Sequence, residues 1–310
     1  MLDLINLTKT YRDLRAVDHL NLHLDEGEIF GFIGPNGAGK TTTIKMIATL
    51  IRPTSGDARV KGISVVEQPE AVRTIIGYMP DTFGVYDDVK VWEYLDFFAA
   101  AYRIPRTERP RLIADVLELT DLHIKRDAFV EELSRGMKQR LCLAKTLLHE
   151  PALLLLDEPA SGLDPRARIE LRELLRQLRR MGKTIFISSH ILSELADFCT
   201  TIGIIEAGAL IASGSVEEII KQAGLTRTVE IRVTAGLESV ESVLRDNPLV
   251  EDVAVEPETD RCQVAFRGEL DDVADLLKAL LDHGVRVVEA TESASDLEGI
   301  FLRVTRGQVA

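Results

Sequence analysis

The chain has 310 residues, 45% of them hydrophobic and 28% charged, with a formal net charge of −13 at neutral pH. This length suffices for about two domains. The acidic balance argues against a nucleic-acid-binding surface, which normally carries a basic patch. No apolar stretch approaches the ~18–20 residues needed to span a bilayer. The three cysteines are far apart and lie among apolar neighbours, so we expect buried free thiols in a reducing compartment.

The first two thirds of the chain predict an α/β domain. Residues 1–33 alternate apolar and polar in short runs, which is typical of antiparallel strands that lead into the apolar strand Ile29–Ile33. From Thr41 onward helical and strand patterns alternate, as in a domain built on a largely parallel sheet. The apolar runs 152–156 and 184–188 predict buried strands. Helical periodicity over about 85–150 indicates a helical insert.

The last third predicts a second, smaller domain. Residues 202–211 predict a hairpin that turns at Glu206-Ala207-Gly208, and a helix is expected from 215 to about 223. Near residue 225 the pattern starts afresh in the order β-α-β-β-α-β, which is typical of a small ferredoxin-like α+β domain. A last helix is expected over about 295–304. We therefore predict two domains, 1–224 and 225–310.

Residues 34–41 read Gly-Pro-Asn-Gly-Ala-Gly-Lys-Thr, a complete phosphate-binding loop of the form G-x-x-x-x-G-K-[ST]. The expected strand before it and the expected helix over 41–50 let backbone N–H groups and a helix N-terminus surround a phosphate. Lys40 adds a cation for the terminal phosphates, and the hydroxyl of Thr41 is a ligand for Mg²⁺. The alternative is a glycine-rich turn that binds nothing, but the flanking strand and helix favour a nucleoside triphosphate site.

Two adjacent carboxylates follow the apolar run 152–156, in the sequence ALLLLDEP. Ligands bind at the carboxyl ends of parallel strands. Asp157 is therefore placed to reach Mg²⁺, and Glu158 to orient and polarise the attacking water. In isolation these letters are equally consistent with a strand-terminating turn, but beside a phosphate loop they favour a hydrolytic site.

A second anion site is predicted in the segment 133–140, which reads LSRGMKQR. Ser134 has the character of an N-cap for the amphipathic helix that follows. Cap, glycine and helix dipole together would bind an anion, whereas helix capping alone is the simpler alternative. The segment 161–165 (SGLDP) follows the two carboxylates, and His190 ends the strand TIFISSH. A histidine at a strand end usually has a structural role, but here it completes an ordered set.

This ordered set resembles the ATP-binding-cassette (ABC) ATPases, with phosphate loop, LSGGQ-like signature, Walker B Asp-Glu, D-loop and switch histidine in that order. The resemblance covers residues 1 to about 220. It implies an α/β P-loop NTPase cassette with an antiparallel β subdomain and a helical insert, in front of the ferredoxin-like domain. ATP and Mg²⁺ are the implied cofactors. The residues that would hold the phosphates and the metal are Gly34, Asn36, Gly37, Ala38, Gly39, Lys40, Thr41 and Thr42.

The resemblance also assigns roles outside the phosphate loop. Tyr11 would stack on the adenine, and Asp157 would bind the metal together with Thr41. Glu158 would be the catalytic base, and His190 would contact the γ-phosphate. With Lys40, these last two form the implied catalytic set.

Two copies of the chain would form a head-to-tail homodimer that encloses two ATP molecules. Ser134 and Gly136 would contact the γ-phosphate bound by the partner subunit, and Asp164 of the D-loop belongs to the same binding set. The signature reads LSRGM where the family pattern is LSGGQ, so Arg135 and Met137 alter the rim of this anion site.

A second departure lies in the segment 76–81, where Asp81 occupies the position of the family's glutamine. An ionised aspartate only accepts hydrogen bonds and adds negative charge beside Mg·ATP. Two like charges ~4 Å apart repel by about 4 kcal/mol at an effective dielectric of about 20. Asp81 therefore either joins the metal ligands or turns toward solvent. We favour solvent, because the turn Pro80-Asp81-Thr82 offers the carboxylate a backbone-bonded position.

The resemblance implies the ATP-hydrolysing subunit of an exporter that acts through a separate polytopic membrane permease. The C-terminal region, up to residues 297–302, resembles the accessory domain of bacterial efflux ATPases of the daunorubicin-resistance type. The first residues lack the pattern of a secretory signal, so we expect a cytoplasmic protein, peripheral on the inner face of the cell membrane through the permease.

Two alternatives remain open. One is a soluble ABC protein of ribosomes or DNA, but the single cassette and the acidity oppose it. The other is a regulatory module that binds ATP without turnover. Intact Glu158 and His190 oppose this module, while Asp81 and the altered signature favour it.

Overall fold

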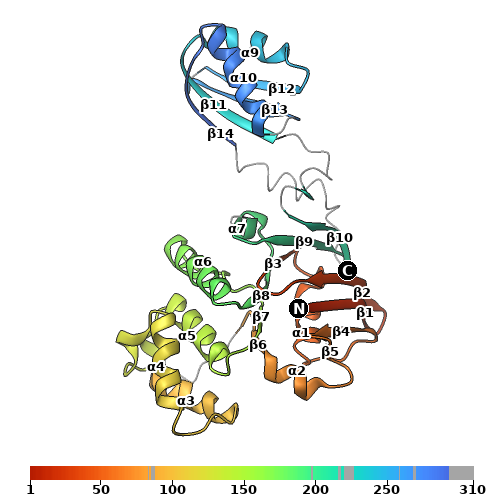
Figure 1. The fold of residues 1–310 in the computed structure, drawn as a ribbon, viewed down its shortest axis with the longest axis vertical. Helices are drawn as coiled ribbons and strands as arrows, with labels where there is room; N and C mark the ends of the chain where they lie inside the picture. Colours follow the sequence, from red (N-terminus) through yellow and green to blue (C-terminus); the bar gives the residue numbers. More distant parts are fainter. Residues whose placement is uncertain are drawn as a thin grey trace. The chain divides into compact units, whose positions relative to one another are not determined.

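The computed structural model describes residues 1–82, 84, 88–196, 198–215, 218–219, 227–257, 259–267 and 270–292. The chain divides into two compact units, Met1–Ser215 with Gly307–Ala310, and Val216–Arg306 (Figure 1). The expected boundary near residue 225, most of the expected helix over 215–223 and the expected last helix lie outside the described residues.

The first unit contains a four-stranded antiparallel sheet with the strand order β2-β1-β4-β5. Its strands are β1 (Leu2–Tyr11), β2 (Leu14–Leu24), β4 (Ser55–Val60) and β5 (Ile63–Ser64). The inward-facing leucines of β1 and β2 are buried in one core with residues of α1 and β4. The predicted antiparallel strands of the first residues are therefore confirmed.

A six-stranded sheet forms the centre of this unit, in the order β10-β9-β3-β8-β7-β6. Its strands are β3 (Ile29–Ile33), β6 (Ile76–Met79), β7 (Leu153–Leu156), β8 (Thr184–Ser189), β9 (Thr201–Glu206) and β10 (Ala209–Gly214). All neighbouring strands are parallel except β9 and β10. Every residue of β3, β7 and β8 is buried, as the apolar runs predicted. The carboxyl ends of these three strands consequently meet at one edge of the sheet.

The hairpin of β9 and β10 turns where the sequence predicted. Ala207 and Gly208 both have positive φ, 46° and 81°, which is the type I′ geometry that matches the twist of paired strands. The turn also fixes the hairpin to the phosphate loop, because Gly208 N donates to Ala38 O at 3.0 Å.

The helices of the first unit fall into two groups. Around the sheets lie α1 (Lys40–Ile47), α2 (Pro69–Ile75), α6 (Pro165–Arg180) and α7 (Leu192–Ala196). Between β6 and β7 the predicted helical insert contains α3 (Val91–Ala101), α4 (Arg109–Leu119), α5 (Arg135–Leu147) and the short 3₁₀ turns η1 (His123–Lys125) and η2 (Val130–Glu132). Figure 1 shows α3, α4 and α5 packed together, and α5 contacts the edge strand β6.

An ion pair joins this helical insert to α6. Arg140 of α5 pairs with Glu170 of α6 and, at 3.2 Å, with Asp121 after α4. Helix α1 ends at Ile47, before the predicted end, because Thr49 takes a positive φ of 61° that no helix accommodates.

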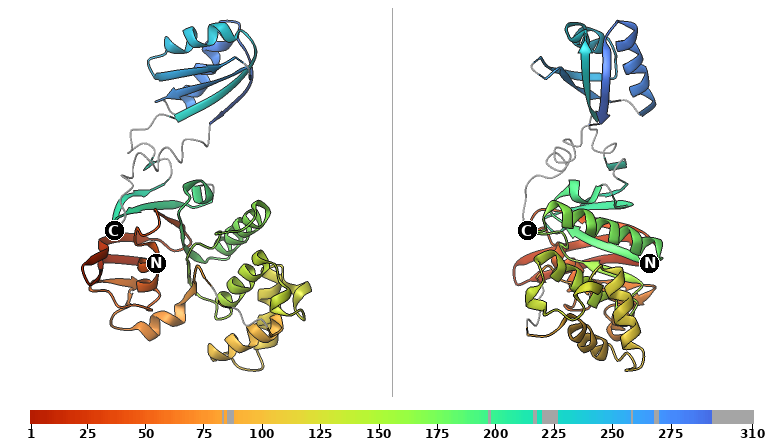
Figure 2. Two further views of the ribbon diagram at one scale, coloured as in Figure 1. Left: turned by 180° about the vertical axis from the view of Figure 1, so that it is seen from behind. Right: turned by 90° about the vertical axis from the view of Figure 1, so that its left-hand side faces the viewer.

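The second unit is a β-α-β-β-α-β domain with the strand order β12-β13-β11-β14, all antiparallel (Figure 2). Its elements are β11 (Arg227–Ala235), α9 (Leu237–Arg245), β12 (Val250–Glu256), β13 (Arg261–Phe266), α10 (Leu270–Asp282) and β14 (Arg286–Glu292). Both helices bury apolar side chains against the same alternating residues of β11, Val229, Ile231 and Val233. The predicted ferredoxin-like fold is confirmed.

All three cysteines are free thiols, and Cys142 and Cys262 are buried. In the described part of the chain, no helix combines the length and the apolar character that crossing a bilayer requires.

Candidate active site

The phosphate loop leaves β3 after Ile33 and enters α1 at Lys40. Two of its glycines are required by close backbone approach: a Cβ on Gly34 would lie 2.3 Å from Ile205 O, and one on Gly39 would lie 2.4 Å from Ala16 O. Gly37 and Gly39 also have φ of 84° and 106°, which side chains disfavour. The glycines therefore let the loop form a cradle, a concave turn lined mainly by backbone atoms.

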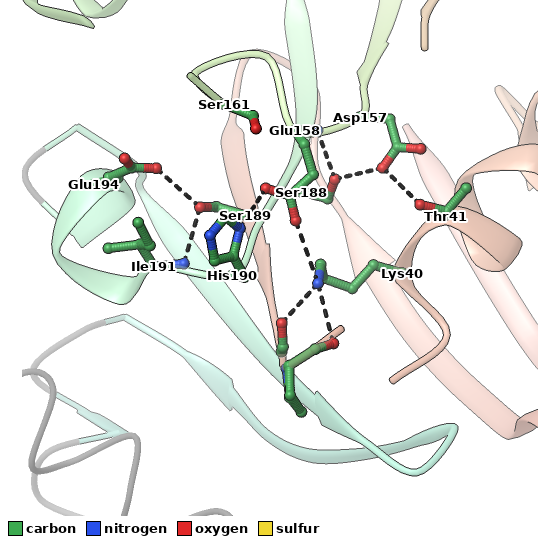
Figure 3. A network of polar contacts seen from close by, with 12 residues as sticks. Lys40, Thr41, Asp157, Glu158, Ser161, Ser188, Ser189, His190, Ile191 and Glu194 are labelled. Atoms are coloured by element: carbon green, nitrogen blue, oxygen red, sulfur yellow. Dashed lines mark hydrogen bonds and ion pairs between the residues drawn. The ribbon is translucent and has the colours of Figure 1, made fainter. Parts of the chain in front are cut away.

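Lys40 closes one side of the loop. Its buried Nζ donates to Gly34 O at 2.6 Å and to Pro35 O at 3.2 Å, and it lies 3.3 Å from Glu158 Oε1 (Figure 3). The ammonium is therefore held between the phosphate loop and the carboxylate that follows β7.

Asp157 is the first residue after β7 and is almost fully buried. Its Oδ1 accepts from Ser188 Oγ at 2.7 Å and from Thr41 Oγ1 at 3.1 Å, while its buried Oδ2 has no hydrogen-bond partner. Burial raises the pKa of Asp157, and the charges of Asp81 and Glu158 add to this rise against the two hydrogen bonds. A buried carboxylate oxygen without a donor, next to a threonine hydroxyl, fits the oxygen ligands that Mg²⁺ takes.

Glu158 occupies a backbone conformation that glutamate rarely adopts. Its φ is 48°, in the left-handed region, and its N–H donates to Ser188 Oγ at 3.0 Å. Such strain persists where the surrounding structure over-determines a residue, often at active sites. In this conformation the carboxylate of Glu158 lies between two partners: Oε2 is 2.8 Å from His190 Nδ1, and Oε1 forms the ion pair with Lys40 (Figure 3).

The structure brings five of the predicted site residues into one network: Lys40, Thr41, Asp157, Glu158 and His190. Other predicted residues of the phosphate loop line the cradle, where Ala38 is buried, Thr42 is half-buried and Asn36 is exposed.

The remaining predicted residues stand apart from this network. Ser134 is the N-cap of α5, and its Oγ accepts from Met137 N at 3.3 Å. Asp164 is the N-cap of α6 and accepts from Ala167 N at 2.9 Å. Tyr11 is 44% exposed at the end of β1.

Two further predicted residues also lie outside the network. Gly136, in the first turn of α5, faces Ala167 of α6, since a Cβ on Gly136 would lie 3.3 Å from Ala167 Cβ. Asp81 is exposed, although its charge contributes to the raised pKa of Asp157. Burial, followed by the charges of Asp157 and Asp81, also raises the pKa of Tyr78 to about 12.

Ser188 was missed by the sequence analysis. Its hydroxyl both donates to Asp157 and accepts from the N–H of Glu158. The sequence carried no signal for it, because the register of the parallel strands appears only in the structure: Leu156 is aligned with Ile187, so the next residue of β8 lies beside Asp157. A hydroxyl at that position completes the hydrogen bonds of the carboxylate pair.

Replacing Asp157 by asparagine is expected to raise the melting temperature of the nucleotide-free protein at neutral pH. The raised pKa means that the folded state binds this proton at a pH where the unfolded chain, with aspartate pKa about 3.9, has lost it. The free energy of unfolding therefore falls as pH rises through that window, and asparagine removes this loss.

Melting curves at several pH values test this expectation, with Asp115→Asn, an exposed aspartate of α4, as the control. The gain should shrink as the pH approaches about 4, and the additional stabilisation by Mg·ATP should be smaller in the variant. A melting temperature of Asp157→Asn below that of the unsubstituted protein at neutral pH would contradict the claim that burying the charge of Asp157 destabilises the folded state.

Comparison with known proteins decides the family. A family model described as ABC transporter matches residues 17–161. The chain is 31% identical over 305 residues to the linearmycin resistance ATP-binding protein LnrL of Bacillus subtilis (strain 168), with 98% of each chain covered. The chain belongs to the ABC transporter ATP-binding proteins. The predicted family is thereby confirmed, and ATP is its nucleotide.

Two other relatives of this ABC protein are named as an export protein and as a probable multidrug transporter protein. The chain is 36% identical over 304 residues to the Nod factor export ATP-binding protein I of Rhizobium meliloti, and the match covers 98% of this chain and 88% of that protein. It is 40% identical over 216 residues to the probable multidrug ABC transporter ATP-binding protein YbhF of Escherichia coli (strain K12). That match covers 70% of this chain, which spans only 37% of the relative's length.

Solved structures confirm the cassette fold. An ATP-binding subunit of an ABC transporter is similar at 32% identity with a TM-score of 0.65, covering 72% of this chain and 93% of that one. A dimeric ATP-binding cassette in a post-hydrolysis state, bound to ADP and phosphate, is similar at 26% identity with a TM-score of 0.64, covering 70% of this chain and 99% of that one.

Proposed function

We propose that this ABC protein hydrolyses ATP to drive export through a separate polytopic membrane permease. The observation that carries hydrolysis is the position of Glu158, whose carboxylate lies between Lys40 and His190 at the edge of the sheet that carries the phosphate loop. The name of one relative, the Nod factor export ATP-binding protein I, supports the direction of transport. On this proposal the protein lies on the inner face of the cell membrane, attached through the permease.

The network supports a division of labour in hydrolysis. Backbone N–H groups of the loop and the Nζ of Lys40 bind the phosphates. To do so, Lys40 gives up its contacts with the loop carbonyls and Glu158 and binds phosphate oxygens instead. Glu158 then orients a water molecule and accepts its proton as the water oxygen bonds to the γ-phosphorus and the bond to ADP breaks. His190 holds the carboxylate through Nδ1 and leaves its other ring nitrogen for the γ-phosphate.

Thr41 and Asp157 would hold Mg²⁺. When bound, the ion neutralises charge on the phosphate oxygens. The unpartnered Oδ2 of Asp157 supports this assignment. Asp81, which is exposed, is proposed as a solvent-facing neighbour of the site and not as a third ligand.

A head-to-tail homodimer with two enclosed ATP molecules accounts for the residues that stand apart from the network. Ser134 and Gly136, at the N-terminus of α5, would complete the site of the partner subunit, and Asp164 lies in the loop that would cross this interface. Tyr11 would stack on the adenine. Residues 225–310 are proposed as an accessory domain.

Ser134→Ala is expected to lower ATP turnover at least 10-fold and to leave ATP affinity in the monomer nearly unchanged, because the hydroxyl serves the other subunit's nucleotide. The lost cap should also cost about 1 kcal/mol of stability. Turnover, monomer affinity and melting curves are measured together.

The matched variant Ser134→Gly separates the two effects. Glycine caps a helix nearly as well as serine, within a few tenths of a kcal/mol, but it has no hydroxyl. Turnover should fall in both variants and stability mainly in the alanine variant. Normal turnover in the glycine variant would show that Ser134 only caps α5 and does not serve the other subunit's nucleotide.

A further inference from the structure

The D-loop (161–165) and the two residues before it are fixed on one side by α5. Arg135 Nη2 donates to Ser161 O at 3.0 Å, and Gln139 Nε2 donates to Pro159 O. Gly162, with φ of 67°, leaves room for the guanidinium, because a Cβ there would lie 2.3 Å from Arg135 Cζ. These contacts tie the backbone of the D-loop to the first turns of the signature helix.

Arg168 of α6 holds the same loop from its other end and reaches a second partner. Its Nε donates to Leu163 O at 3.1 Å, and its Nη1 lies 3.0 Å from Glu194 Oε1. The side chain of Arg168 is 37% exposed and that of Glu194 is 13% exposed, so solvent screens this ion pair less than a pair that is fully exposed. One planar guanidinium thus serves two acceptors on different segments, which a lysine ammonium on a single flexible stem does not reproduce.

Glu194 continues the connection to the loop that carries His190. Its Oε2 accepts from Ser189 Oγ at 3.1 Å, and the same Oγ accepts from Ile191 N at 3.0 Å (Figure 3). Both neighbours of His190 in the chain are therefore held by one hydroxyl, and Glu194 orients that hydroxyl.

We propose that Arg168 and Glu194 are positioning residues that make the placement of His190 depend on the D-loop. The contacts run from Leu163 O through Arg168, Glu194 and Ser189 to the backbone on either side of His190, and neither charged residue belongs to the nucleotide-binding network. The effect on turnover rests on the proposed function, since His190 acts there beside Glu158. The effect on the position of His190 does not.

The test compares Arg168→Lys, Glu194→Gln and the double variant in the full chain. The matched control is Arg166→Lys on the same helix, whose side chain is 90% exposed. We expect each single variant to lower kcat about 10-fold, as second-layer contacts of a site do, with KM for ATP changed less than 2-fold. Because both substitutions break one connection, the double variant should be no more than about 2-fold slower than the slower single variant.

A second readout works without hydrolysis. The ring resonances of ¹⁵N-labelled histidines, with His190 identified among the 6 histidines by its loss in His190→Gln, report the surroundings of its ring. His190 should shift in Arg168→Lys and Glu194→Gln and remain in place in Arg166→Lys. Unshifted His190 resonances, or multiplying effects on kcat in the double variant, would overturn the proposal. An inactive wild-type protein with the expected shifts would instead overturn the proposed function alone.

Discussion

Glu158→Gln is expected to lower the rate of ATP hydrolysis by ~10²–10⁴-fold while ATP-dependent dimerisation persists. The amide preserves the shape of the side chain and still accepts a hydrogen bond, but it does not take a proton from water. It also removes the charge that pairs with Lys40 at 3.3 Å, so the lysine is freer to bind phosphate.

Steady-state hydrolysis and size-exclusion chromatography with and without Mg·ATP measure the two effects. The control is Glu70→Gln, since the side chain of Glu70 is 85% exposed on α2. A dimer that forms with Mg·ATP and does not turn over is the expected product. An unchanged hydrolysis rate would remove Glu158 from the mechanism.

Lys40→Ala is expected to weaken ATP binding by about 2–5 kcal/mol, roughly 30-fold to several thousand-fold. The variant loses the cation for the phosphates and leaves the mostly buried carboxylate of Glu158 without its ion-pair partner. The unpaired negative charge of Glu158 would then lie beside the phosphates and oppose their binding.

Titration with a fluorescent ATP analogue measures the affinity, and a melting curve shows whether the variant is folded. Lys61→Ala is the control, because Lys61 is exposed and pairs with exposed Glu26 at 3.5 Å. A folded Lys40→Ala protein with the affinity of the wild type would rule out Lys40 as a phosphate ligand.

The central site was predictable because its parts are local. The glycines at 34, 37 and 39 permit the close backbone approaches and the positive φ values that the loop needs and that side chains disfavour. The fully buried strands β3 and β7 were visible as apolar runs, and strand order then places their carboxyl ends together. The cap at Ser134 was likewise visible, because an N-cap depends on the next three residues only.

The supporting contacts were not predictable, since they join residues that only the tertiary structure brings together. Ser188 meets Asp157 across the register of two strands, and Arg168 meets Glu194 between α6 and α7. The left-handed backbone of Glu158 also carries no sequence signal, because glutamate is not a residue that favours positive φ.

Mixing two inactive variants tests the account most directly. In a head-to-tail dimer each ATP lies between the phosphate loop of one chain and Ser134 of the other. Lys40→Ala and Ser134→Ala chains should each be nearly inactive alone, but their heterodimer contains one intact site. Mixing them should therefore restore hydrolysis in proportion to the heterodimer formed. A mixture no more active than the sum of its components would contradict the proposal that two copies of the chain share each site.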